Sequence, residues 1–258
     1  MWLFKRAMKC LPAATGPFMP GCMDVMLGYD QESPMLRLFY PTNAKKDEKE
    51  NTKKYVPWLP DDSYLVGISR VLMLHLYIVR LLLWWRGRTY VPVLYGEKIR
   101  TNEKLKCIVM SHGLGGSRFL YSNICYELAS NGFLVLCLEH KEMSACNTYF
   151  YANQEDARND KRTIIDFRHI ALGENHYTER NEQIKFRSKE CNKVVQFLED
   201  LNGGNVPYNV VADVPTEHDI LFDLNDLVAN LDLENLTMMG HSFGGATALN
   251  SIANNKKI

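Results

Sequence analysis

The sequence predicts an α/β fold in which a mostly parallel sheet carries helices on both faces. The first observation behind this prediction is Lys106–Leu138, where an apolar run, a glycine-rich turn, a helical pattern and a second apolar run follow one another. The second is Leu236–Ala253, where an apolar run leads through a glycine-bounded turn into a helix-compatible stretch. Because parallel strands need a crossover connection, usually a helix, this alternation indicates a parallel sheet.

The turn in the second segment has the pattern G-x-S-x-G, with Ser242 at its centre. Between a strand and a helix, this pattern is typical of the nucleophile elbow of α/β-hydrolases. Gly240 and Gly244 lack a Cβ atom, which lets strand and helix approach closely around a serine in a strained backbone conformation. The serine Oγ would project at the sheet edge, before a helix N-terminus that favours an oxyanion. We therefore predict an α/β-hydrolase fold with Ser242 as the nucleophile.

A second glycine-rich stretch, His112–Gly116, follows the apolar run Cys107–Met110. An uninterrupted apolar run is expected of a strand buried on both faces. An α/β-hydrolase places its oxyanion loop after such a strand and takes a second backbone N–H from the residue after the nucleophile. We predict Leu114 and Phe243 as these two donors, since the glycines around Leu114 free its amide to turn inward. Phosphate binding is not predicted, because the loop lacks the P-loop lysine.

The residues that should complete a catalytic triad are missing after Ser242. In α/β-hydrolases an acid and a histidine follow the serine along the chain, but no Asp, Glu or His lies between Ser242 and Ile258. His241 and His112 are expected to have structural roles. His140 ends a predicted strand on the same sheet edge and is the one substitute base that we consider within the chain.

Composition limits the class of protein. A chain of 258 residues with 46% apolar residues suits one domain, residues 1–258, here predicted to be an α/β-hydrolase domain truncated shortly after the elbow. The 30 basic and 30 acidic residues give no basic excess for nucleic acid. Seven scattered cysteines without a C-x-x-C pair indicate neither a zinc site nor a disulfide framework, and we predict no metal and no cofactor. The first residues show no signal peptide, which favours a cytoplasmic location. The alternative is an extracellular location, if the true N-terminus carries a signal peptide.

The remaining elements are predicted from local patterns. After the glycine-rich turn, Leu120, Ile124 and Leu128 form a helical stripe with Tyr121 and Cys125 beside it, and Asn131-Gly132 is a fitting helix stop. Cys22–Leu27 and Met35–Tyr40 are expected to form an antiparallel strand pair. Asn181–Leu201 has the apolar period of a helix, and Asp223–Asn230 is expected to be a short helix before the elbow strand. The polar segment Ser144–Tyr177 is too long for a plain loop and is expected to carry local structure or to line a cleft.

The most apolar segment is Val71–Trp85. As one helix its fifteen residues would be too short to cross a bilayer, at about 1.5 Å per residue, and His75 and Arg80 interrupt it. Two interpretations remain. The segment is either a buried core helix or a helix lying on a lipid surface. In the second case Tyr77, Trp84 and Trp85 would sit at the headgroup level, Leu82 and Leu83 would enter the lipid, and Arg80, Arg86 and Arg88 would meet phosphates.

The two glycine motifs together, SHGLGGSR at 111–118 and GHSFGGAT at 240–247, resemble the platelet-activating factor acetylhydrolase family, of the serine-dependent plasma and intracellular type II kind. Further matching stretches extend the resemblance over nearly the whole chain: TGPFMPGCMD at 15–24, LRLFYP at 36–41, LASNGFLV at 128–135, EHKE at 139–142 and RNEQ at 180–183.

The resemblance implies a calcium-independent α/β-hydrolase that cleaves short or oxidised sn-2 acyl chains from phospholipids, of the 1-alkyl-2-acetylglycerophosphocholine esterase type. It also implies Ser242 as nucleophile and the Leu114 and Phe243 amides as the oxyanion hole. In the family an apolar helical segment near the Val71–Trp85 position rests on a membrane or lipoprotein. Leu82, Leu83, Trp84 and Trp85 are therefore the expected lipid-surface residues.

The family's aspartate and histidine follow its serine by tens of residues, so we expect this sequence to be the N-terminal portion of such an enzyme. On its own it should then be nearly inactive. Two alternatives remain open. One is a carboxylesterase acting on small soluble esters. The other is a lipid-binding product that has lost its chemistry.

Overall fold

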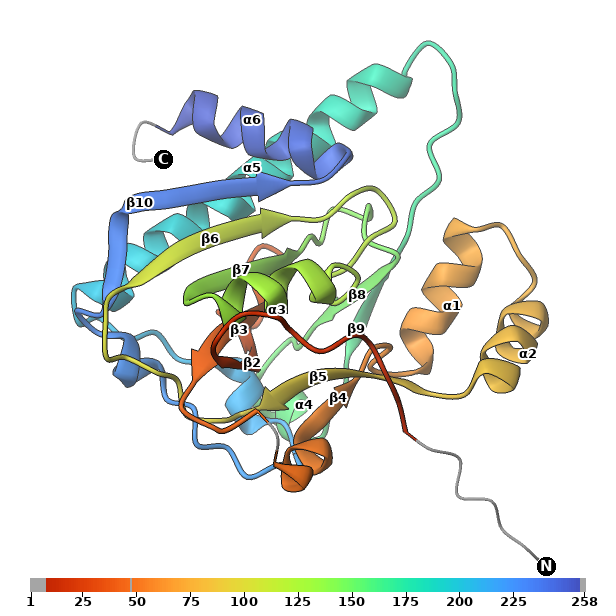
Figure 1. The fold of residues 1–258 in the computed structure, drawn as a ribbon. Helices are drawn as coiled ribbons and strands as arrows, with labels where there is room; N and C mark the ends of the chain where they lie inside the picture. The colour runs from red at the N-terminus through yellow and green to blue at the C-terminus, as the bar shows by residue number, and fades with distance from the viewer. Residues whose placement is uncertain (1–7, 47, 256–258) are drawn as a thin grey trace, which may run out of the picture.

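A mixed sheet with the strand order β1-β5-β2-β3-β7-β6-β10 runs through the middle of the molecule, and β4 pairs with β5 (Figure 1). The structure is a computed structural model that describes residues 8–46 and 48–255, without the side chains of Lys49 and residues 83–86. The strands of this sheet are β1 (Lys9–Cys10), β2 (Met19–Met26), β3 (Met35–Thr42), β4 (Tyr55–Pro57), β5 (Thr89–Tyr95), β6 (Leu105–Ser111), β7 (Phe133–Glu139) and β10 (Leu231–Gly240).

Helices cover both faces of the sheet, as predicted. α3 lies on one face, and α5 and α6 lie together on the other (Figure 1). The helices are α1 (Asp62–Val71), α2 (Leu76–Arg86), α3 (Ser122–Ser130), α4 (Gln154–Arg158), α5 (His176–Asn202) and α6 (Phe243–Asn254), with 3₁₀ helices η1 (Lys49–Lys54), η2 (Val210–Asp213) and η3 (Leu224–Leu227). The polar segment after residue 144, for which the sequence predicted local structure of no particular kind, contains a small sheet of β8 (Asn147–Phe150) and β9 (Thr163–Asp166) together with α4.

The central strands are buried on both faces, which explains their uninterrupted apolar sequences. Along β6, Cys107 and Val109 pack in the cluster that contains the buried side of α5. Their neighbours Ile108 and Met110 pack in the cluster that contains Cys125 of α3. Successive side chains of a strand point to opposite faces, so a strand covered on both faces needs apolar residues at every position. β7 and β10 flank β6 in parallel register, and β2 and β3 form the predicted antiparallel pair.

The segment Val71–Trp85 is two helices rather than one, which corrects the prediction. α1 ends at Val71, Met73 has a positive φ of 54°, and α2 begins at Leu76. The Leu74 N–H donates to the Ser69 carbonyl at 3.0 Å, which closes a turn of six residues. This is the hydrogen bond of a Schellman helix end, with methionine where glycine is usual. The helical pattern of the sequence continues through the break and does not reveal it.

The corner between α1 and α2 is apolar and exposed. Seven of its apolar side chains are from 43% to 81% exposed: Leu72, Met73, Leu74, Tyr77, Ile78, Leu81 and Leu82. The interpretation as a buried core helix therefore fails for residues 72–82, although Val79 is buried. Among the described residues, no single helix is long and apolar enough to cross a membrane. α1 and the first turns of α2 reach that length and composition only together, across a bend of 117°.

Candidate active site

The turn between β10 and α6 has the backbone of a nucleophile elbow. Ser242 has φ 54° and ψ −119°, a conformation that costs a residue with a side chain about 1–3 kcal/mol. A Cβ added to Gly240 would lie 2.1 Å from the carbonyl oxygen of Gly244, and one added to Gly244 would lie 2.1 Å from that of Ser111. The two glycines therefore allow contacts that no other residue could make. The predicted strain and close approach are both present.

The elbow presents its serine to solvent. Ser242 is exposed, and its side chain makes no capping hydrogen bond to α6. Gly240 at the end of β10 pairs with Ser111 at the end of β6. Because these strands are parallel, the loop that follows Ser111 leaves the sheet at the same edge as the elbow. This pairing brings together the two glycine motifs, which lie far apart in the sequence.

The amides around Leu114 are engaged, whereas that of Leu114 is not. Gly113 N–H donates to the hydroxyl of Tyr121 at 3.2 Å. Gly115 N–H donates to the Ser144 carbonyl at 2.7 Å, and Gly116 N–H to the Gly113 carbonyl at 3.0 Å. Within residues 8–46 and 48–255, the Leu114 N–H donates to no protein group. Leu114 is 42% exposed, so water can satisfy this donor until a substrate oxygen replaces it, and an oxyanion hole requires such a donor.

The peptide between Gly113 and Leu114 is held from its carbonyl side. The Gly113 oxygen accepts hydrogen bonds from Gly116 N–H at 3.0 Å and from His112 Nδ1 at 2.8 Å. In a planar trans peptide the N–H points opposite to the carbonyl, so the Leu114 N–H projects from the other side of the loop. Phe243 is the first residue of α6, where a helix leaves its N–H groups without intrahelical partners. Both predicted donors are thus available, but their role in catalysis stays a prediction.

His112 supports this loop, as expected. Its side chain is fully buried, and burial together with the nearby charge of Arg187 holds its pKa well below the usual value. The ring is therefore neutral at pH 7. Its Nδ1–H donates to the Gly113 carbonyl, and its Nε2 accepts the His140 N–H at 3.2 Å. Protonation of Nε2 would remove that second hydrogen bond, which fits a structural role rather than that of a base.

The substitute base that we considered, His140, is not placed to serve Ser242. Its ring is fully buried, with Nε2 2.7 Å from the hydroxyl of Ser111 and Nδ1 2.6 Å from a carboxylate oxygen of Glu190. Burial lowers its pKa well below the usual value. The ligand-type atoms of His140, Glu142 and Glu190 lie within 4.8 Å of one another, a spacing that metal sites also use. Of the three, His140 and Glu190 are hydrogen-bonded to each other, whereas Glu142 Oε1 accepts from Arg187 Nε and its buried Oε2 has no partner among the described residues.

His241 also has a local partner. Its Nδ1 lies 2.9 Å from the hydroxyl of Tyr121, the same hydroxyl that accepts the Gly113 N–H. Tyr121 therefore links the elbow to the oxyanion loop. The sequence pattern puts Tyr121 beside a helical stripe and gives no sign of this link, because the contact joins residues 120 positions apart.

The apolar corner of α1 and α2 adjoins the loop of Leu114. A Cβ added to Gly115, which has φ 71°, would lie 2.6 Å from Cγ1 of Val71, so the end of α1 packs directly on this loop. Leu82 is 56% exposed and Leu114 is 42% exposed. The side chains of the other predicted lipid-surface residues, Leu83, Trp84 and Trp85, lie outside the described residues.

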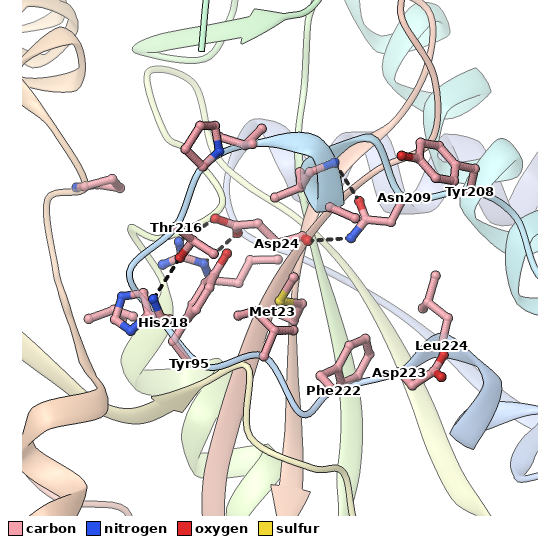
Figure 2. Close-up of a pocket in the computed structure, with 18 of the residues that line it drawn as sticks. Met23, Asp24, Tyr95, Tyr208, Asn209, Thr216, His218, Phe222, Asp223 and Leu224 are labelled. Atoms are coloured by element: carbon pink, nitrogen blue, oxygen red, sulfur yellow. Dashed lines mark hydrogen bonds and ion pairs between the residues drawn. The ribbon is translucent and has the colours of Figure 1, made fainter. Parts of the chain in front are cut away.

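A cavity of about 920 Å³ lies elsewhere, between β2, β5 and the loop of residues 206–225 (Figure 2). Asp24, Tyr95, His218 and Phe222 line it, whereas the elbow and the oxyanion loop do not. Asn209 closes it beside β2 by donating to the Asp24 carbonyl at 3.1 Å and accepting the Met26 N–H at 3.0 Å. The cavity is therefore separate from the Ser242 region.

Comparison with known families decides the classification. The family model described as platelet-activating factor acetylhydrolase, isoform II, matches residues 4–258. The chain belongs to this family. The platelet-activating factor acetylhydrolase of Bos taurus is 32% identical over 247 residues, and that of Gallus gallus is 34% identical over 251. The resemblance drawn from the two glycine motifs is confirmed.

The matched relatives are longer than this chain. The alignments cover 96% of the chain but 53% of the Bos taurus protein, and 94% of the chain but 57% of the Gallus gallus protein. The chain thus spans about half the length of these acetylhydrolases. A ferulic acid esterase from Streptomyces cinnamoneus has a similar structure, with a TM-score of 0.60 at 15% identity over 98% of the chain and 60% of the esterase. This likeness supports the α/β-hydrolase fold.

Proposed function

We propose that this protein is a serine esterase that cleaves the short or oxidised sn-2 acyl chain of phospholipids without calcium. The observation that carries the proposal is the strained, exposed Ser242 beside the unpaired Leu114 amide. Membership of the platelet-activating factor acetylhydrolase family supports the substrate class. The groups that would act are a hydroxyl and backbone amides, which need no metal ion. The cytoplasmic location stays a prediction.

In the proposed reaction, Ser242 Oγ loses its proton to a general base and attacks the sn-2 carbonyl carbon. The carbonyl oxygen becomes an oxyanion that accepts hydrogen bonds from the Leu114 and Phe243 amides. Collapse of this intermediate expels the lysophospholipid alcohol and leaves an acyl-serine, which water then hydrolyses to the short acid. No histidine among residues 8–46 and 48–255 makes a hydrogen bond to Ser242 Oγ. The hydrogen bonds of the described residues therefore do not identify the general base.

Labelling with a fluorophosphonate probe tests the nucleophile. We expect mass analysis of native extract to find the phosphonyl group on the Ser242 peptide, because the probe reacts with activated serines. Ser242→Ala should abolish the label and lower hydrolysis of a 2-acetyl phospholipid by about 10⁴-fold or more. Ser251→Ala, which changes a buried serine of the same helix, is the matched control and should keep the label. Labelling of another residue, with Ser242 unmodified, would refute the proposal.

We further propose that the corner of α1 and α2 rests on a lipid surface. Tyr77, Ile78, Leu81 and Leu82 are each at least half exposed, although burial of such side chains is favourable by about 1.5–3 kcal/mol each. Val71 at the end of α1 packs against Gly115 of the oxyanion loop. A phospholipid leaving the surface at this corner would therefore meet the loop next to Ser242. Arg80 and Arg88 are exposed and could meet phosphates there.

Flotation with phosphatidylcholine vesicles tests this surface. Leu81→Asp combined with Leu82→Asp should reduce the bound fraction by more than about tenfold, since two exposed leucines would no longer enter the lipid. Leu249→Asp is the matched control. Leu249 is 71% exposed but lies on α6, on the opposite side of the molecule from α2 (Figure 1). Equal loss of binding in the control, or none in the double variant, would exclude this corner as the lipid-binding surface.

A further inference from the structure

One buried side chain from α5 contacts both halves of the proposed oxyanion hole. Arg187 is fully buried, and its Nη1 donates to the His112 carbonyl at 2.7 Å. Its guanidinium carbon lies 4.6 Å from the ring centroid of Phe243. His112 precedes the loop that supplies the Leu114 amide, and Phe243 supplies the other amide. The oxyanion loop and the elbow each carry a predicted catalytic group, whereas α5 carries none.

The contact with His112 orients the first peptide of the oxyanion loop. The His112 carbonyl and the Gly113 N–H belong to one planar peptide. Arg187 holds the carbonyl side of this peptide, while the Tyr121 hydroxyl accepts the N–H at 3.2 Å on the other side. A peptide held at both ends cannot rotate. The next peptide, which carries the Leu114 N–H, is held in turn at the Gly113 carbonyl by Gly116 N–H and His112 Nδ1, so the two peptides are oriented together.

The opposite side of the guanidinium is anchored by the loop after β7. Arg187 Nε donates to Glu142 Oε1 at 2.6 Å and to Ser144 Oγ at 2.9 Å. The Ser144 carbonyl accepts the Gly115 N–H at 2.7 Å, so the same loop also holds the far side of Leu114. Glu142 balances the positive charge of Arg187. The contribution of Arg187 is therefore geometric, rather than a net positive potential at the oxyanion.

We propose that Arg187 is a positioning residue that fixes the Leu114 and Phe243 amides relative to each other; this inference rests on the proposed function. The planar guanidinium forms directed hydrogen bonds in the plane of its fork and stacks on an aromatic ring through its face. Arg187 uses the first property on His112 and Glu142, and its guanidinium carbon lies over the Phe243 ring, 4.6 Å from the centroid. A lysine in its place could keep the charge but not both contacts.

Paired substrates that differ in one atom test this role in the protein expressed from the complete natural gene. One is a 2-acetyl phospholipid, and the other is its thionoester, in which sulfur replaces the carbonyl oxygen. Sulfur accepts N–H hydrogen bonds weakly, so the ratio of kcat/KM for ester to thionoester measures stabilisation by the oxyanion hole. Loss of one oxyanion donor lowers kcat by about 10²–10³-fold. Arg187→Met displaces donors without removing them, and we expect the ratio to fall by about tenfold.

Two further variants make the result specific. Arg187→Lys keeps the charge toward Glu142 but not both contacts, so it should also lower the ratio. This variant tests the positioning role if Arg187→Met does not fold. Arg37→Met removes another buried arginine, whose ion pair is with Asp24. Arg37 makes no hydrogen bond to either motif, and in this variant Asp24 keeps its second partner, Arg118, which follows the oxyanion loop. This control should lose folding stability with an unchanged ratio, since general loosening affects both substrates equally.

The outcomes separate the two proposals. A lowered ratio in both Arg187 variants, with an unchanged ratio in Arg37→Met, supports the positioning role. An unchanged ratio in active Arg187 variants overturns it and leaves the esterase function standing. If the wild-type protein hydrolyses neither substrate and its Ser242 takes no fluorophosphonate, the proposed function fails, and the role of Arg187 fails with it.

Discussion

Replacing Gly244 with alanine is expected to lower the free energy of unfolding by about 3 kcal/mol or more and to abolish hydrolysis. The added Cβ would lie 2.1 Å from the Ser111 carbonyl oxygen and 2.8 Å from that of His112. Both are backbone atoms at the start of the oxyanion loop, so neither can turn aside as a flexible side chain would. Relief of the clash requires α6 to move away from β6, which would shift Ser242 and Phe243 from Leu114.

The neighbouring glycine provides a matched control for this prediction. A Cβ on Gly245 would meet nothing closer than the Gly240 carbonyl oxygen at 3.7 Å, an ordinary contact. Alanine is favoured over glycine in a helix by about 1 kcal/mol, so Gly245→Ala should be neutral or slightly stabilising. Urea denaturation followed by far-ultraviolet circular dichroism measures both variants. If Gly244→Ala and Gly245→Ala change the free energy of unfolding equally, the close approach at Gly244 does not hold the elbow together.

The parts of the fold predicted correctly from the sequence are those with strong local patterns. β6 and β7 are apolar at successive positions because both faces are covered, and Gly132 with φ 94° ends α3 where the sequence indicated a stop. The elbow was predictable because its two glycines are required by backbone contacts only a few residues away in sequence or across one strand pair.

Other features depend on contacts that the local sequence does not contain. The predicted apolar stripe of α3 was Leu120, Ile124 and Leu128, but Ile124 is 39% exposed and the helix buries Cys125 and Ala129 instead. The small side chains lie against the sheet, where a closely packed helix has little room. The helical pattern gave the presence of the helix, and Leu128 does pack against the core cluster, but Ile124 was wrongly placed on the buried face.

The supports of the candidate site are also non-local. Arg187 reaches His112 across 75 residues, and Glu190 reaches His140 across 50. In the sequence both lie among the many charged residues of a long helix that has only one apolar side. Their burial could not be predicted, because it depends on α5 crossing the end of the sheet beside both motifs. Charged residues are rarely buried unless paired, and the partners come from the loops that follow β6 and β7.

Replacing Arg118 with methionine is expected to lower the free energy of unfolding by about 3–5 kcal/mol. Arg118 follows the oxyanion loop and is 2% exposed, with Nη1 2.6 Å from Glu139 Oε2 and Nε 3.1 Å from Asp24 Oδ1. Although burial raises the pKa of Asp24, the charges of Arg118 and Arg37 lower it below its usual value, so Asp24 is ionised in the folded protein. Without Arg118, Asp24 keeps the Arg37 pair, but the fully buried Glu139 loses the one ion pair that it forms among the described residues.

A double variant separates the buried charge from the loss of side-chain packing. Glu139→Gln should restore about 1 kcal/mol or more to Arg118→Met, because an amide in the place of the carboxylate removes the unpaired charge while Tyr64 can still donate to it. The exposed pair of Arg168 and Glu179 is the matched control, and Arg168→Met should cost less than about 1 kcal/mol. Additive losses in the double variant would mean that Arg118 stabilises the fold through its packing, and that Glu139 tolerates burial without it. Non-additive recovery would instead show that Arg118 and Glu139 act as a pair behind the oxyanion loop, so that this loop is held in place by paired charges as well as by backbone contacts.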